Sequence, residues 1–287
     1  MKNFTINTVI LLALLFGITN LTNAQWTQIG QDIDGEEGAS GSAVSLNADG
    51  TVVAIGAPCN GENGIDAGQV AIYKFNSGNW LQMGNDLDGD TAVDNFGKSV
   101  CLSSDGTILA IGAYRNDGNG NDAGHVKVYE YNGSNWIQLG NNIEGEAAGD
   151  NSGISVSLNS DGKIVAIGAL YNDGSATNSG HVRIFEYSGG NWIQMGSDID
   201  GEGWNNNSGR SVSLSSDGSI VAIGAITNDG NSGNSNDDRG HVRIYEYSGG
   251  NWIQVGNDID GENAGDWSRV YCKFKFRWKY CCYRCTL

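Results

Sequence analysis

Acidic residues recur about every 56 residues in this chain, in the pattern Asp-x-Asp-Gly-Glu or a close variant. Side chains two apart on a β-strand point to the same face, so a pair of these carboxylates could share a cation. A solvated acidic rim is the alternative, and we prefer it. The copies are Asp32, Asp34 and Glu36; Asp86, Asp88 and Asp90; Asn142, Glu144 and Glu146; Asp198, Asp200 and Glu202; and Asp258, Asp260 and Glu262. Our metal candidates among them are Asp86, Asp88, Asp90, Asp198, Asp200 and Glu202.

Polar loops supply a second group of candidates, for ligand binding. The longest loop runs from Asn228 to Asp238 and also contains Asp229 and Asp237. Trp204 stands in a loop where other units have alanine, at Ala148 and Ala264. Loops on a rigid scaffold often carry function, and an exposed tryptophan can stack on a glycan or contact a protein. Asn-Asp-Gly is, however, also ordinary turn chemistry.

Three histidines begin the same predicted strand of successive units: His125, His181 and His241. Equivalent positions of a ring converge only near its axis, and these strands should lie well away from it. We therefore expect a structural role for the histidines and no metal cluster among them. The sequence shows no Ser-His-Asp arrangement outside strand positions and no phosphate loop, so we predict no catalytic residues.

All these side chains belong to a sequence repeat of about 56 residues, which determines their spacing along the chain. The Asp-Gly pair recurs at Asp49, Asp105, Asp161 and Asp217, in steps of 56 residues. The tryptophan of a Trp-x-Gln-x-Gly motif recurs at Trp26, Trp80, Trp136, Trp192 and Trp252. Complete units start near residues 41, 97, 153 and 209. A period of this length is typical of solenoids, propellers and other arrays.

Each unit divides into four short strands, which in the second unit are expected at 98–103, 107–113, 125–131 and 136–143. Alternating or β-branched runs separated by Asp-Gly and Asn-Gly turns predict antiparallel hairpins. Tandem four-stranded units favour an all-β propeller, with a β-solenoid as the alternative. The chain begins with a lone fourth strand at Trp26, so we expect four complete blades, one orphan strand and an incomplete, truncated ring.

Composition and charge limit the partners. The chain has 287 residues, 44 glycines and a net charge of −17. Residues 25–266 hold all 33 acidic residues. An acidic body argues against nucleic acid or anionic lipid, which require a basic face. An extracellular protein or a glycan is therefore the expected partner.

The first 24 residues read as a secretory signal. Lys2 provides the positive start, residues 9–18 form an apolar core too short to span a bilayer, and small residues precede Gln25. We expect a secreted or cell-surface protein that has no transmembrane segment once the signal is removed.

Residues 267–287 do not follow the repeat. This segment has no glycine and carries Cys272, Cys281, Cys282 and Cys285. Read one nucleotide later, its codons can spell VSLSSDGSIVAIGA, which is identical to residues 212–225. We therefore predict a frame-shifted tail, without a native fold, that once encoded a fifth unit.

The repeat motifs resemble those of a known family. Asn95-Phe96-Gly97, with Gly112-Ala113 and with Gly56-Ala57-Pro58, is similar to the FG-GAP repeats of integrin α-subunit heads and secreted bacterial proteins. The resemblance covers residues 25–266 and implies a seven-bladed propeller with calcium bound in some hairpins through a DxNxDGxxD pattern. Those ligand places fall here on Ser45, Asn47, Asp49 and Val53, and on Ser157, Asn159, Asp161 and Val165. The first and last carboxylates are missing, so we expect plain turns and no cofactor.

Together these features predict an exported, FG-GAP-like β-propeller that acts as a binding or adhesion module without catalytic activity of its own. The alternative is a truncated propeller enzyme, a lyase or glycosidase, whose catalytic residues lie in missing downstream sequence.

Overall fold

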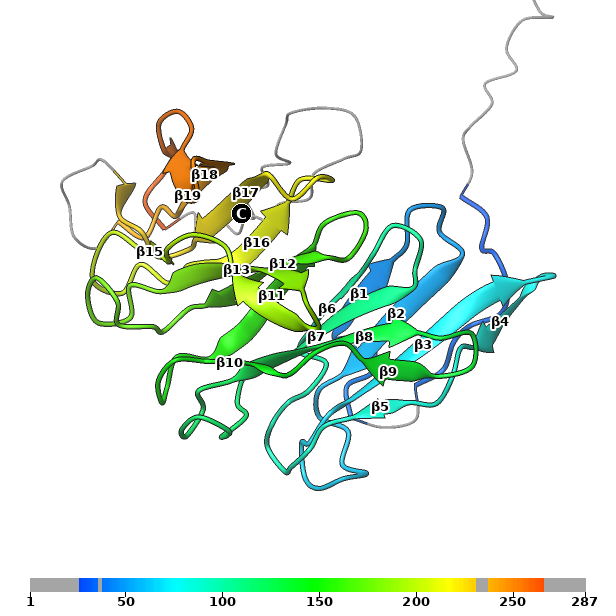
Figure 1. The fold of residues 1–287 in the computed structure, drawn as a ribbon. Helices are drawn as coiled ribbons and strands as arrows, with labels where there is room; N and C mark the ends of the chain where they lie inside the picture. The colour runs from blue at the N-terminus through cyan, green and yellow to red at the C-terminus, as the bar shows by residue number, and fades with distance from the viewer. Residues whose placement is uncertain (1–25, 36–37, 231–236, 266–287) are drawn as a thin grey trace, which may run out of the picture.

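The computed structural model describes residues 26–35, 38–230 and 237–265. Within these ranges the chain forms twenty β-strands, in four antiparallel sheets, and no α-helix. Figure 1 shows the sheets following one another in chain order, from blue through green and yellow to orange. The all-β prediction is confirmed. The predicted signal at 1–24, Glu36 and the predicted frame-shifted tail at 267–287 lie outside the described residues.

Each sheet is built from one repeat. The first contains β1 (Ala43–Leu46), β2 (Val52–Ala57), β3 (Gln69–Asn76), β4 (Asn79–Gln82) and β5 (Leu87–Asp88). The second contains β6 (Ser99–Leu102), β7 (Ile108–Ala113), β8 (His125–Tyr131), β9 (Trp136–Gln138) and β10 (Ile143–Glu144). The third contains β11 (Ser152–Leu158), β12 (Ile164–Ala169), β13 (His181–Ser188), β14 (Asn191–Gln194) and β15 (Ile199–Asp200). The fourth contains β16 (Ser208–Leu214), β17 (Ile220–Ala225), β18 (His241–Ser248), β19 (Asn251–Gln254) and β20 (Ile259–Asp260).

The predicted fourth strand is broken into two short pieces. In the second sheet, β9 pairs with the far end of β8 (Tyr131 with Trp136), and β10 pairs with its beginning (Val126 with Ile143). Gly140 lies between the pieces with a φ of 76°, a conformation that favours glycine. The Trp-x-Gln-x-Gly motif therefore contains the first short strand and the glycine that follows it, and the acidic motif includes the second short strand.

The hydrophobic core lies between sheets. Three clusters of buried side chains each join two successive sheets; Ile72 and Leu109, for example, belong to the first cluster. All six residues of β7 are buried, as expected for a strand covered on both faces. The third strands are buried only over their first part, and Glu130 and Glu186 are exposed. The second strand is therefore more completely buried than the third.

Glycine permits the sheets to approach closely near their first strands. The first strands β1, β6, β11 and β16 contact one another in succession. A Cβ atom on Gly112 would collide with the carbonyl oxygen of Gly153 in the next sheet, and one on Gly168 with that of Gly209. The Ser99 hydroxyl donates to the same Gly153 oxygen at 2.8 Å. The glycine of the Ile-Gly-Ala motif is therefore a packing requirement.

The repeated tryptophans join each sheet to the one before it. The indole Nε1 donates to a backbone oxygen of the preceding unit at 2.7 Å for Trp136, 2.8 Å for Trp192 and 2.8 Å for Trp252. Each of these rings also packs against an aromatic ring of its own third strand, with centroids 5.1–5.3 Å apart. The repeated tryptophans therefore pack between neighbouring sheets.

Residues 26–35 do not form the predicted orphan strand, since they have no assigned strand pairing. They nevertheless occupy an outer-strand position against the first sheet. Trp80 Nε1 donates to Ile29 O at 3.2 Å, which is the equivalent of the Trp136 bond to Met83. Trp26 is 98% exposed, unlike the other repeated tryptophans. Partner strands would be needed to make this segment a strand.

Candidate functional site

The acidic motifs lie at the joints between sheets. We define a joint as the place where the last acidic residue of one unit meets the third strand of the next sheet. The three joints described here bring Asp90 to Lys127, Glu146 to Arg183, and Glu202 to Arg243. The acidic residues of one motif are thus divided between two sheets.

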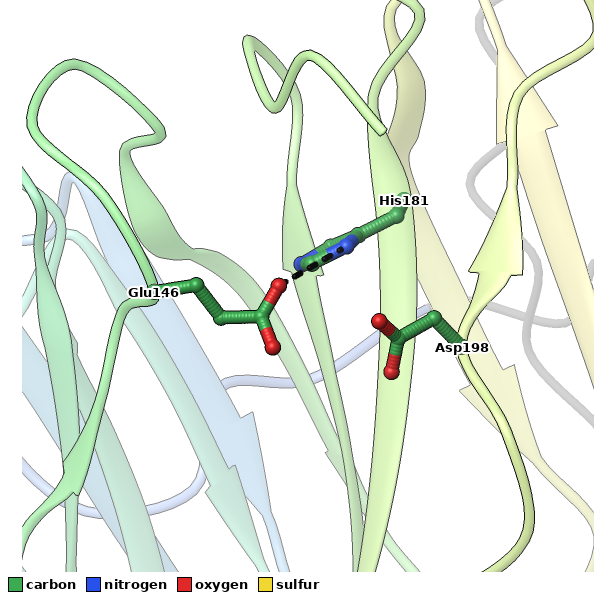
Figure 2. Close-up of side chains that lie close together, drawn as sticks. All are labelled: Glu146, His181 and Asp198. Carbon is green, nitrogen blue, oxygen red and sulfur yellow. Dashed lines mark ion pairs between the residues drawn. The ribbon is translucent and has the colours of Figure 1, made fainter. Parts of the chain in front are cut away.

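The second joint places a buried histidine between two carboxylates. Glu146 Oε2 lies 3.8 Å from Nδ1 of His181, while Oε1 lies 3.4 Å from Nη1 of Arg183. Asp198, from the sheet of His181, completes a group whose ligand atoms all lie within 4.8 Å of one another. Figure 2 shows the carboxylates of Glu146 and Asp198 below the imidazole ring of His181 in this view, on different segments of the chain.

The third joint repeats this arrangement. His241 Nδ1 lies 3.9 Å from Oε2 of Glu202 and 3.7 Å from Oδ2 of Asp258. Arg243 Nη1 lies 3.6 Å from Oε1 of the same glutamate. The carboxylate of Glu202 therefore presents one oxygen to the arginine and the other to the histidine.

The first joint differs at four positions, and two of the changes are Lys127 in place of arginine and Glu144 in place of aspartate. Asp90 replaces the glutamate, and both its oxygens accept hydrogen bonds from Lys127 Nζ at 2.6 Å. Asn142 replaces the aspartate and accepts a hydrogen bond from Gln138 Nε2 at 2.9 Å. His125 is equally buried but faces Glu144 of its own sheet, at 3.9 Å. This joint lacks the two-carboxylate geometry of the others.

The histidines of the second and third joints are neutral at physiological pH. Burial, followed by the charge of Arg183, lowers the pKa of His181 to about 4. Burial and Arg243 likewise lower the pKa of His241 to about 4. Burial also raises the pKa of Glu146, with Arg183 opposing it. One ring nitrogen of each imidazole therefore remains available as an acceptor or a metal ligand.

Glutamine side chains of the same sheet donate hydrogen bonds to several of the acidic metal candidates. Gln82 Nε2 donates to Asp86 at 2.8 Å, and Gln69 Nε2 donates to Asp88 at 3.1 Å. Gln194 Nε2 donates to Asp198 at 2.6 Å. Burial and the nearby charge of Asp198 raise the pKa of Asp200. The first acidic residue of a motif is thus held by its own sheet, and the third reaches the next sheet.

Two of the loop candidates are structural. Asn228 and Asp237 are buried, with exposures of 7% and 6%. Asn228 Nδ2 donates to Asn206 Oδ1 at 3.1 Å, and the same loop bond recurs from Asn172 to Asp150 at 3.0 Å. Arg239 Nε donates to Asp237 Oδ2 at 2.9 Å. These side chains hold their loops together, as the turn interpretation predicts.

The other three loop candidates line an open hollow of about 710 Å³. Trp204, Asp229 and Asp238 lie in its wall with Tyr171 and Arg210. The wall is made by loops of three successive sheets and by the beginnings of first strands. Trp204 is 67% exposed and Tyr171 is 45% exposed. Sequence reasoning missed Tyr171, because only the fold brings the end of β12 beside Trp204.

Over the described ranges, the chain has no helix that could cross a membrane.

Comparisons with known proteins agree with this geometry. Residues 86–129 match the model of the FG-GAP repeat. The fold is similar to that of periplasmic gluconolactonase PpgL of Pseudomonas aeruginosa, with a TM-score of 0.54 and 17% identity over 80% of this chain and 60% of that one. It is also similar to hydrazine synthase of Kuenenia stuttgartiensis, with a TM-score of 0.50 and 12% identity over 82% of this chain and 53% of that one. No curated protein matches the sequence.

The comparisons support the fold and the family of the repeat. The chain contains an FG-GAP repeat, and its four sheets are β-propeller blades. Identities of 17% and 12% show the fold alone. The chain spans about 60% of the gluconolactonase and about half of the hydrazine synthase chain.

Proposed function

We propose that this chain is an exported FG-GAP-like β-propeller module that binds a neutral glycan in the hollow beside Trp204, as an adhesion protein does. The exposed indole of Trp204 carries the proposal. A large aromatic side chain that is 67% exposed in a concave wall leaves apolar area unburied. The flat face of a sugar ring can cover such a side chain.

The remainder of the wall suits a polar ligand. Asp229, Asp238 and Arg210 provide charged groups, and Asn205 and Asn207 provide amides. Ligand sites of this kind combine aromatic side chains with a few polar groups that fix orientation. The net charge of −17 would repel an acidic polysaccharide, so a neutral one fits better. The signal-like residues 1–24 and the occurrence of FG-GAP repeats in secreted proteins support export.

The test compares two exposed side chains of the full chain. Trp204→Ala should weaken binding to a panel of neutral polysaccharides about tenfold, measured by affinity electrophoresis and calorimetry, because it removes the stacking face. Ile193→Ala is the matched control: Ile193 is 56% exposed on β14, away from the hollow, and its loss should not change binding.

Three outcomes would contradict the proposal. The first is retention of binding by Trp204→Ala, and the second is a fall in its melting temperature that marks Trp204 as core. The third is the absence of binding to any neutral polysaccharide by the unmodified chain. Hydrolysis of gluconolactone, lost on Asp229→Asn or Asp238→Asn, would instead favour an enzyme.

A further inference from the structure

The second and third joints each contain a buried nitrogen without a hydrogen-bond partner. Nδ1 of His181 and Nδ1 of His241 are both buried and unpaired, as is Nδ1 of His125 in the first joint, and all three histidines are 1% exposed. Buried polar atoms are normally hydrogen-bonded, so three such atoms at equivalent positions need an explanation. His181 and His241 each lie in a group with two carboxylates, and Figure 2 shows the group of His181.

The separations are too long for hydrogen bonds and suit two ligands of one ion. The nitrogen-to-oxygen distances are 3.8 Å from His181 to Glu146, and 3.9 and 3.7 Å from His241 to Glu202 and Asp258. An N–H···O hydrogen bond extends to about 3.2 Å. Two ligands at about 2.1 Å from a tetrahedral zinc ion lie about 3.4 Å apart, which is slightly less than these separations. An ion at the centre of the group would satisfy the nitrogen and both carboxylates.

We propose that Glu146, His181 and Asp198 bind one divalent ion of the zinc type, and that Glu202, His241 and Asp258 bind a second. One nitrogen and two carboxylate oxygens are zinc-type ligands, whereas calcium and magnesium take oxygen ligands. Three protein ligands leave a further position for water. The exposed glutamates, with side-chain exposures of 42% and 46%, give the ion a route from solvent.

The arginines hold the carboxylates in position. Arg183 lies beside Oε1 of Glu146 and leaves Oε2 toward His181, and Arg243 does the same for Glu202. Such outer partners orient metal ligands. Their positive charge also lowers the affinity for a cation, so the sites should bind more weakly than a closed structural zinc site.

The ion would connect neighbouring blades. Glu146 follows β10 of the second sheet, whereas His181 and Asp198 belong to the third, and the next site joins the third sheet to the fourth in the same way. An ion that binds the folded chain and not the unfolded chain stabilises the folded state. The proposed role is therefore a metal link between blades, separate from the hollow beside Trp204.

The first joint provides a control within the same molecule. It has His125, but Asn142 and the lysine-bound Asp90 stand where the other joints have Asp198 and Glu146. This joint should not bind zinc. Asp90→Glu combined with Asn142→Asp should create a third site.

The experiment measures zinc bound to the metal-free full chain by calorimetry and elemental analysis, together with the melting temperature. Zinc should raise the melting temperature, and calcium and magnesium should not. His181→Gln with His241→Gln should remove two zinc ions per chain and abolish the shift, whereas His125→Gln should change neither. Asp198→Asn with Asp258→Asn should weaken binding about tenfold or more without removing the buried rings.

Any zinc bound elsewhere, for example by the tail cysteines, would also bind to the double histidine variant. The amount bound by this variant is therefore subtracted from the amount bound by the unmodified chain. The proposal is overturned if the double variant binds as much zinc as the unmodified chain, or if the unmodified chain binds none. If the double histidine variant does not fold, the double aspartate variant decides by the same criterion.

Discussion

The Asp217 carboxylate is held by hydrogen bonds within the turn between β16 and β17. The Ser215 hydroxyl donates to its carboxylate at 2.6 Å, and the Ser219 backbone N–H and hydroxyl donate at 3.0 and 2.8 Å. These hydrogen bonds, led by that of Ser215, hold the pKa of Asp217 below its ordinary value of 3.8. The same bond to the backbone two residues later recurs at Asp49, Asp105 and Asp161. The interpretation of the Asp-Gly pair as a turn is confirmed.

Asp217 should make stability depend on acid pH. Because its pKa is lower in the folded chain than in the unfolded chain, the carboxylate stabilises the fold above pH 3.8. This contribution is lost as the pH falls through the folded-state pKa. Asp217→Asn should therefore melt lower than the unmodified chain at pH 6, and the difference should shrink toward pH 2. A difference in melting temperature that does not change with pH would contradict this prediction.

Cys101 occupies a position where the neighbouring sheets have serine. Ser45 Oγ accepts a hydrogen bond from Leu102 N at 3.0 Å, and Ser157 Oγ accepts one from Leu214 N at 3.0 Å. Cys101 Sγ receives the equivalent bond from Leu158 N at 3.2 Å. Sulfur is a weak acceptor, so this is the weakest of the three contacts.

Cys101→Ser should stabilise the chain by up to about 1 kcal/mol, because a hydroxyl oxygen is the better acceptor. Urea unfolding of the two chains measures the difference. Ser157→Cys is the reciprocal control and should destabilise by a similar amount. A loss of stability on Cys101→Ser would show that apolar packing of the sulfur is worth more than the hydrogen bond.

At the scale of the elements, glycine controls how closely two sheets pack. Gly168→Ala should cost about 1–3 kcal/mol, because its Cβ would overlap the Gly209 carbonyl oxygen of the next sheet. Gly61→Ala is the matched control, since its Cβ would meet only the Gly64 oxygen at 3.8 Å. Chemical denaturation measures both. Equal stability of the two variants would mean that the sheets do not meet at these glycines.

The strands were predictable from sequence and the joints were not. Alternation, β-branched runs and Asp-Gly turns depend on neighbouring residues, so the first three strands of each unit fell in the predicted places. The break at Gly140 depends on a positive φ that the strand pattern did not reveal. Glu146 and His181 are 35 residues apart and meet only because successive sheets stack. The sequence compares the histidines with one another, whereas in the structure His181 and His241 each face carboxylates of two sheets.

The same limit applies to the hollow. The sequence alone identifies Trp204 as a candidate, because the equivalent position of other units is alanine. Asn228 and Asp237 were grouped with Asp229 and Asp238 because loop composition cannot separate buried from exposed positions. Only the fold shows that the first pair supports the loop and the second pair lines the hollow.

At the scale of the whole molecule, negative charge opposes compaction. The net charge is −17, and few basic residues are available to offset it. Added salt screens repulsion among exposed carboxylates, so the melting temperature should rise between low and physiological ionic strength. Sodium chloride titration in a metal-free buffer measures the effect, and a fall in melting temperature would show that ion pairs at the joints outweigh the repulsion.

Hydrogen exchange of the full chain tests the central claim, that the chain binds a neutral glycan in the hollow formed by loops of successive blades. The chain is compared with and without the neutral polysaccharide that it retains. The account predicts slower exchange at residues 203–207 and 226–229 and no change on β4 or β14. Protection confined to the outer strands, with the hollow unaffected, would contradict it.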